Sequence, residues 1–248
     1  MKTMTLKLVR MPDAGLEAEN IRPESFAGKS VDEVTNIELF SGNKTLRLRE
    51  VFEVEGNTAE NAGEQHIILE GDLSRVKRIG ESMTCGEITI KGDVGYHLGE
   101  NMSGGIITVE GNAGSWIGTD MTGGEITIKG NAGSFIGCAR RGMSDGMGGG
   151  KITVEGDAGS EVGDGMHGGE ITVNGNVDSF VGSYMKAGVI KVGSLGSRPG
   201  YAMMGGKIII QKRFEMPFYF RETGKEGDYA CHEGDVGFKG KGVIQAKE

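Results

Sequence analysis

The chain has 248 residues, a formal net charge of -8, 46 glycines and only four prolines. An acidic chain without a basic stripe is poorly suited to neutralise phosphate backbones, so DNA and RNA are not expected partners. Three scattered cysteines, Cys85, Cys138 and Cys231, are too few for a disulfide framework and fit a reducing compartment. The glycine content is high for an ordinary globular domain and favours a repeated architecture.

The N-terminal sequence MKTMTLKLVRMPDAG has too short and too interrupted an apolar run for a secretory signal. No stretch approaches the roughly 18 apolar residues of a membrane span. We therefore expect no membrane partner and a cytoplasmic location. Residues 1–68 lack the repeat that follows and are predicted to form an N-terminal cap.

Residues 69–211 carry a repeat of 19 residues, which lengthens to 26 once and shortens to 18 once. Seven methionines mark it: Met83, Met102, Met121, Met147, Met166, Met185 and Met203. Five and seven residues after each methionine stand two aliphatic residues, as in Ile126 and Ile128. A spacing of two places both side chains on one face of a β-strand. One repeat cannot bury its own apolar face, so we predict about seven stacked 19-residue coils, an all-β, single-stranded parallel β-helix.

Glycines recur where each predicted strand ends. They are Gly92, Gly111, Gly130, Gly156 and Gly175. Glycine tolerates a positive φ and a close approach of backbones, so these positions are predicted to be the corners of the coils. An aspartate or asparagine follows each of them, as expected for turns.

The third coil carries seven extra residues, Ala139 to Asp145, while the strand patterns on both sides continue. We expect this insertion to leave the stack at a corner as a loop, a common location for binding residues in repeat proteins. It contains Arg140 and Arg141, two cations in an acidic chain. They are either solvated or candidate contacts with an acidic neighbouring subunit, where bidentate arginine is favoured.

Residues 212–248 are predicted to form a C-terminal cap and tail. The segment RFEMPFYF concentrates aromatic residues in a chain that has few. They are Phe214, Phe218, Tyr219 and Phe220. We expect them to cover the last coil, with part of the cluster as a candidate contact between subunits.

No set of residues has the spacing of a catalytic or metal site. The histidines lack metal-ligand spacing, and no helix follows the glycine strings to hold a phosphate. An acyltransferase built on a β-helix, with His97 or His167 as base, is the less favoured alternative. That class requires an aliphatic residue at every sixth position, whereas the inward positions here fall at spacings of two, four and four.

The repeat and the segment LEAENIRPESFAGKSVDEVTNIELFSGNK together resemble the C subunit of tungsten- or molybdenum-containing formylmethanofuran dehydrogenase. The words KRIGESMTCGEITIKGDV, GNAGSWIG and RRGMSDGMGGG extend the similarity, which runs from about Leu16 to about Ile210. The C subunit of a bacterial formyltransferase/hydrolase complex is an alternative. The glycine-rich β-helix also resembles the C-terminal domain of the glutamate synthase large subunit.

This resemblance implies a right-handed β-helix and a non-catalytic, structural subunit that holds catalytic subunits together. The complex would reduce carbon dioxide to formate and transfer the formyl group to methanofuran. The tungsten or molybdenum pterin, the dinuclear metal site and the iron-sulfur centres are expected in the partner subunits, and no cofactor is expected in this chain. The tungsten and molybdenum forms are not distinguished.

Overall fold

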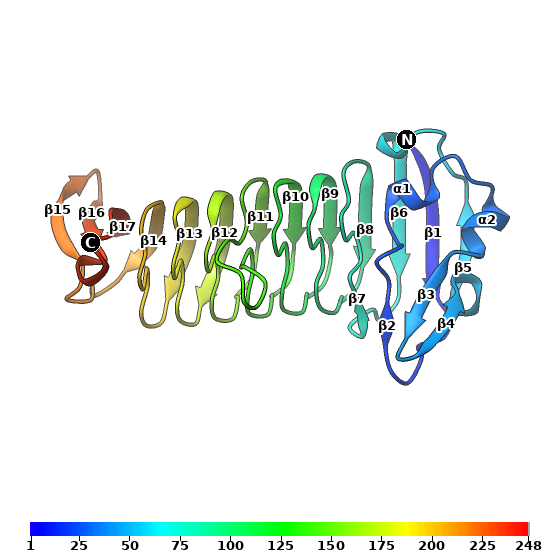
Figure 1. Cartoon of the computed structure of the whole chain (residues 1–248), viewed down its shortest axis with the longest axis horizontal. Coiled ribbons are helices and arrows are strands. Elements are labelled where there is room, and N and C mark those ends of the chain that lie inside the picture. The colour runs from blue at the N-terminus through cyan, green and yellow to red at the C-terminus, as the bar shows by residue number, and fades with distance from the viewer. Residues whose placement is uncertain (248) are drawn as a thin grey trace.

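The computed structural model describes residues 1–247 and is an all-β structure dominated by one large sheet. In Figure 1 its strands stand side by side along the long axis, with the N-terminal elements at one end and the C-terminal elements at the other. The order of the thirteen strands is β15-β16-β17-β14-β13-β12-β11-β10-β9-β8-β6-β1-β5. The strands from β6 through β14 to β17 pair in parallel, each with the next along the sheet.

The repeats contribute one strand each to this sheet. The strands are β8 (Glu87–Lys91), β9 (Ser103–Val109), β10 (Gly123–Ile128), β11 (Lys151–Val154), β12 (His167–Val177), β13 (Ala187–Leu195) and β14 (Lys207–Arg213). The aliphatic positions keep their register along the whole series, so that Ile88 pairs with Ile107 and Ile107 with Ile126, while irregularities fall elsewhere in β10 and β12. The prediction that the aliphatic pairs share one core is confirmed, because all fourteen side chains are at most 1% exposed. The seven methionines are also fully buried.

A second, shorter ladder runs beside the sheet. It consists of isolated parallel bridges from Leu73 to Val94 and onward through Ala113, Ala132, Ala158 and Val177. Each repeat therefore turns between strand and bridge and returns to the sheet one position along, and the turns stack as Figure 1 shows. The stacking is what gives every repeat an apolar neighbour on both sides.

The corner glycines are required mainly by close approach. A Cβ on Gly111 would lie 2.4 Å from Oδ1 of Asp93, and one on Gly175 would lie 2.3 Å from Oδ1 of Asp157. Of the five predicted corner glycines, Gly92 alone has a positive φ, of 139°. The repeat thus uses glycine at this corner because consecutive coils touch there, and left-handed backbone conformation is concentrated at a different corner.

The N-terminal segment adds strands and a second sheet. β1 (Lys2–Leu8) lies between β5 (Phe52–Gly56), which is antiparallel to it, and β6 (Gln65–Glu70), which is parallel. A four-stranded sheet is formed by β4 (Lys44–Arg47), β3 (Glu38–Ser41), β2 (Leu16–Glu17) and β7 (Val76–Lys77). The remaining elements are α1 (Pro23–Phe26), α2 (Val31–Thr35), η1 (Leu48–Glu50) and η2 (Ala62–Glu64). Ser30 and Glu33 form a capping box on α2.

At the C-terminal end, β17 (Gly242–Lys247) pairs in parallel with β14, and β16 (Tyr229–Gly234) and β15 (Arg221–Glu226) follow in antiparallel order. η3 (Val236–Phe238) lies between β16 and β17. Ile244 pairs with Ile208 and is fully buried, so the aliphatic column continues beyond the predicted repeats. It also continues before them, because Ile67 pairs with Ile88. The large sheet crosses both predicted boundaries, 68/69 and 211/212, and the division into caps and repeat domain stays a prediction.

The insertion leaves the stack without disturbing it. Ala139 to Asp145 form turns and coil, while Ile126 still pairs with Ile152 across them. Within residues 1–247, no helix is long and apolar enough to cross a membrane.

Candidate functional site at the insertion

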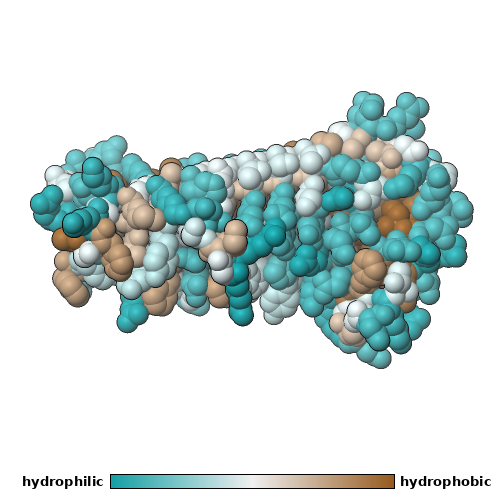
Figure 2. Space-filling model, in the orientation of Figure 1, coloured by the Kyte–Doolittle hydropathy of each residue, from teal (hydrophilic) through white to brown (hydrophobic). Residues whose placement is uncertain are grey.

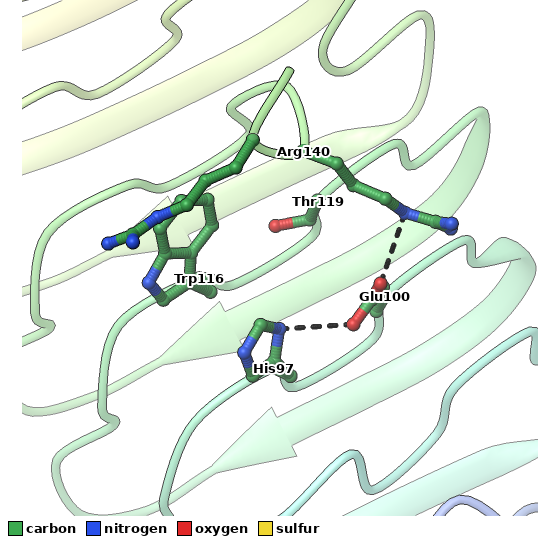
Figure 3. A pocket seen from close by; sticks show the side chains of 6 residues that line it. His97, Glu100, Trp116, Thr119 and Arg140 are labelled. Carbon is green, nitrogen blue, oxygen red and sulfur yellow. Dashed lines mark ion pairs between the residues drawn. The ribbon is translucent and has the colours of Figure 1, made fainter. Parts of the chain in front are cut away.

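A cavity of about 400 Å³ opens where the insertion folds back over the preceding coils. Its walls come from three consecutive turns, before β9, before β10 and before β11, as Figure 3 shows. Six residues line it: His97, Glu100, Trp116, Thr119, Arg140 and Arg141. The volume falls within the range of small-molecule sites, roughly 300 to 1,000 Å³.

One wall is an aromatic stack that the repeat places in register. His97, Trp116 and Phe135 occupy the same corner of three successive coils, and all three have a positive φ of 61° to 66°. The rings are nearly parallel, with centroids 5.9 Å apart between His97 and Trp116 and 4.3 Å apart between Trp116 and Phe135. Because each residue is held in the left-handed conformation, the ring column follows from the coil geometry and needs no other support.

Glu100 supplies a buried carboxylate, with its side chain 6% exposed. Oε2 lies 3.0 Å from Nδ1 of His97, at an angle outside that of a regular hydrogen bond, and 3.8 Å from Nη1 of Arg78. Oε1 lies 3.1 Å from Nε of Arg140. The contact with His97 does most to hold the pKa of Glu100 below its ordinary value, against the opposing effect of burial, and the two arginines add to it.

Arg140 is therefore paired within its own chain. Nε also lies 2.7 Å from Oδ2 of Asp120, and the guanidinium donates a hydrogen bond to Asn101. The pKa of Asp120 is raised, chiefly because burial disfavours its charged form, although Arg140 acts in the opposite direction. Arg140 anchors the insertion to the two coils before it. Its guanidinium is occupied by these acidic side chains, which sequence reasoning did not identify.

Arg141 has a different environment. Its guanidinium lies over the Trp116 ring, 5.6 Å from the centroid, and forms no ion pair within residues 1–247. In Figure 3 the Trp116 side chain stands on the opposite side of the pocket from Glu100. A guanidinium fixed over an aromatic ring keeps its N–H donors available for a carboxylate or a phosphate.

Cys138 and His167 lie near the site but do not line its cavity. The Cys138 thiol, which follows in the same column as Glu100 and Thr119, donates to the carbonyl of Phe135 at 3.2 Å. Burial raises the pKa of this thiol to about 12, so it is not a thiolate at neutral pH. His167 begins β12 and does not line the cavity. In the described part of the chain, no group of three or more His, Cys, Asp or Glu side chains could hold a metal ion.

The C-terminal aromatic residues lie apart from this cavity and differ from one another. Phe220 is 7% exposed and contacts the end of the stack near Gly200, whereas Phe218 is 98% exposed. Phe214 and Tyr219 are partly buried against the core. Their role as contacts between subunits stays a prediction, as does that of Arg140 and Arg141.

Sequence reasoning missed the carboxylate at the centre of the site. Glu100 follows the left-handed Gly99, in the column that contains Thr119, Cys138 and Ser183, all of which are at most 5% exposed. The same column also contains Glu81 and Asp164, which follow Gly80 and Gly163, so its composition did not single out Glu100. Its partner Arg140 lies forty positions later in the sequence, in the insertion, so periodicity alone could not connect them.

Comparisons with known proteins agree on the class of protein that the chain resembles. No protein-family model matches the chain. It is 44% identical over 98 residues to the C subunit of tungsten-containing formylmethanofuran dehydrogenase 2 of Methanothermobacter thermautotrophicus, covering 40% of this chain and 36% of that protein. It is 49% identical over 86 residues to the C subunit of molybdenum-containing formylmethanofuran dehydrogenase 1 of Methanosarcina barkeri, covering 35% of this chain and 29% of that one. The chain thus spans about a third of the length of the curated relatives it matches.

A solved structure matches over nearly the whole chain. It belongs to the formyltransferase/hydrolase complex (FhcABCD) of Methylorubrum extorquens with methylofuran, at 31% identity and a TM-score of 0.90. The match covers 98% of this chain and 99% of that one. Fold and site define an all-β protein of stacked glycine-rich repeats with a cavity of aromatic and charged side chains at one insertion. The chain belongs to the family of formylmethanofuran dehydrogenase C subunits.

Proposed function

We propose that this chain is a structural subunit of a formylmethanofuran dehydrogenase complex and that it holds the catalytic subunits together. The observation that carries the proposal is the match over 98% of the chain to one chain of a four-component complex. The curated relatives are named as subunits of formylmethanofuran dehydrogenase. Their names do not favour the two alternatives, the bacterial formyltransferase/hydrolase complex and glutamate synthase.

In this proposal the repeats form a right-handed parallel β-helix, which provides a rigid surface for partners. The aliphatic positions that stay aligned from β6 to β14, and the parallel bridges beside them, support that architecture. A core filled by aliphatic columns does not bend easily, because its side chains are close-packed. Rigidity suits a scaffold, since docked subunits then keep a fixed separation.

The chemistry of the complex, reduction of carbon dioxide to formate and transfer of the formyl group to methanofuran, is assigned to other subunits. The tungsten or molybdenum pterin, the dinuclear metal site and the iron-sulfur centres belong to them, in the cytoplasm. Within this chain Arg141 is the candidate contact for an acidic partner. Its guanidinium is fixed over Trp116 and is free of intramolecular ion pairs in residues 1–247, unlike that of Arg140.

The test is to purify the chain alone and within its native complex. The isolated chain should bind no stoichiometric metal by elemental analysis and should neither form nor hydrolyse formylmethanofuran. With the other subunits present, it should elute in one particle with the redox and hydrolase activities on a sizing column. Turnover or bound tungsten, molybdenum, zinc or iron in the chain alone would overturn the proposal and direct attention to His97.

A further inference from the structure

A second cavity of about 400 Å³ lies on the other side of the insertion from the Glu100 pocket. It is formed by the insertion and the three turns that follow, before β12, before β13 and before β14. Its lining residues are Ala139, Met143, Ser144, Asp164, Gly165, Tyr184, Lys186 and Met204. We call it the Asp164 cavity. Apart from the insertion, its residues come from the same corner of successive coils, so the repeat fixes their positions.

The rim of the Asp164 cavity is apolar and accessible. Met143 is 68% exposed, and Tyr184 and Met204 are each 48% exposed. Tyr184 packs edge to face on Tyr201, which in turn packs on Phe238, itself 55% exposed. Figure 2 shows hydrophobic residues toward both ends of the face in view, the C-terminal end among them. Several large apolar side chains exposed together mark a contact surface more often than isolated ones do.

Asp164 provides the charge in this cavity. Within residues 1–247 its carboxylate has no ion pair, and the like charge of Glu161 acts on it. The ammonium of Lys186 is already engaged, because it binds the carboxylate of Asp145 and the carbonyl of Ser144. A half-buried carboxylate without a cation is unfavourable unless something outside the chain supplies one.

We infer that the Asp164 cavity receives a lysine or arginine side chain from another subunit of the complex. The long aliphatic stem of such a residue would pack on Met143, Met204 and Tyr184, and its cationic head would reach Asp164. The size of the cavity, its apolar rim and the unpaired negative charge of Asp164 all match a lysine or arginine side chain. The inference rests on the proposed function, since it requires a partner subunit.

The insertion would then present two contacts of opposite charge. On one side Arg141 offers donors to a carboxylate, and on the other Asp164 accepts a cation. Opposite charges on the two sides of one loop would fix the orientation of a docked partner, because the reversed arrangement places like charges together.

The test compares Asp164→Lys and Asp164→Asn with the control Asp178→Lys, an exposed aspartate outside the cavity. Each variant is co-expressed with the wild-type chain and the partner subunits, and the ratio of the two chains retained on a tagged redox subunit is measured by mass spectrometry. We expect about tenfold depletion of Asp164→Asn and stronger depletion of Asp164→Lys, because truncating one member of a desolvated charge pair weakens binding by at least that factor. Asp178→Lys should be retained like the wild type.

Equal retention of Asp164→Lys and wild type would overturn the inference while leaving the proposed function intact. Failure of the wild-type chain itself to be retained would overturn the proposed function. Depletion of Asp178→Lys to the same degree would show a general effect of charge and would also overturn the assignment. A wild-type chain that dimerises alone, and loses the dimer in Asp164→Lys, would identify a second copy as the occupant. Thermal melts of each purified variant establish that it is folded.

Discussion

Oδ1 of Asn131 accepts the backbone N–H of Asp157 at 2.8 Å, across the coil that contains the insertion. The same bond recurs in the coils that have no insertion. There the backbone N–H of Asn131 donates to Oδ1 of Asn112 at 2.9 Å, and the backbone N–H of Asn112 donates to Oδ1 of Asp93 at 2.7 Å. The turn residues beside the corner glycines thus form a continuous side-chain ladder. The insertion adds residues to one coil without removing a step of this ladder.

Asn131→Ala should lower the free energy of unfolding by about 0.5 to 1.5 kcal/mol, because the N–H of Asp157, at an exposed position, loses its intramolecular acceptor. Urea denaturation followed by circular dichroism measures the change. The matched control is Asn174→Ala, an exposed asparagine on β12 whose side chain forms no hydrogen bond in the described structure. Equal urea midpoints for Asn131→Ala and Asn174→Ala would show that the side-chain ladder contributes nothing to stability.

Ile107→Lys should unfold the protein or cost several kcal/mol, because it places an unpaired charge between two packed coils. Ile106→Lys is the control on the same strand, where the parent side chain is 43% exposed and lies between Glu87 and Glu125 in the neighbouring strands. We expect it to melt close to the wild-type temperature. Similar melting of the two variants would contradict the assignment of Ile107 to the core.

Most of the repeat could be predicted from the sequence, because its aliphatic pairs fall at fixed positions after each methionine and register follows from that period. The outer strands were missed for a physical reason. Ile244 occupies the same column as Ile208, yet Lys239 stands where the repeat has its methionine, because β17 closes the stack after a hairpin rather than a coil. Side chains that reach between coils, such as Arg140 toward Glu100, follow no period and needed the structure.

Arg140→Ala should lower the free energy of unfolding by about 1 to 2 kcal/mol at neutral pH, because Glu100 and Asp120 lose a shared cation in a nearly buried site. Arg141→Ala is the control, and its loss of one cation–π contact should cost about 0.5 kcal/mol. Urea denaturation compares them. Because the pKa of Glu100 is lowered, its stabilising pairs act above its ordinary pKa and fade as pH falls through the folded value. The difference in free energy of unfolding between Arg140→Ala and Arg141→Ala should therefore become smaller at acidic pH.

Deleting Ala139 to Asp145 should leave the β-sheet circular dichroism intact, since Ile126 and Ile152 are already in register across the insertion. We expect weaker retention of the shortened chain by its partner subunits, because Arg141 and Met143, one of the rim residues of the Asp164 cavity, are removed together. Co-expression and pull-down on a tagged partner measure this. A deletion variant that assembles like the wild type would exclude the insertion from the interface.

Asp164→Asn should raise the stability of the isolated chain at pH 8. Burial, with a smaller effect of Glu161, raises the pKa of Asp164 from 3.8 to about 6. The folded state thus binds a proton that the unfolded chain releases near pH 4, so stability falls as pH rises through this window and the penalty is complete above about pH 6. Asparagine removes the charge and with it the penalty.

After allowance for solvent screening, the gain should be about 1 kcal/mol at pH 8, equivalent to about 2 to 4 °C in Tm, and it should shrink toward zero near pH 4. Differential scanning calorimetry at the two pH values measures it. Asp178→Asn, on an exposed corner, is the control and should shift Tm equally at both pH values. If Asp164→Asn were no more stable than wild type at pH 8, the carboxylate would be well solvated or paired, and its destabilising role in the free chain would be wrong. A gain at pH 8 would mean that the isolated chain is less stable with the ionised carboxylate, as expected for a group whose cation comes from a partner.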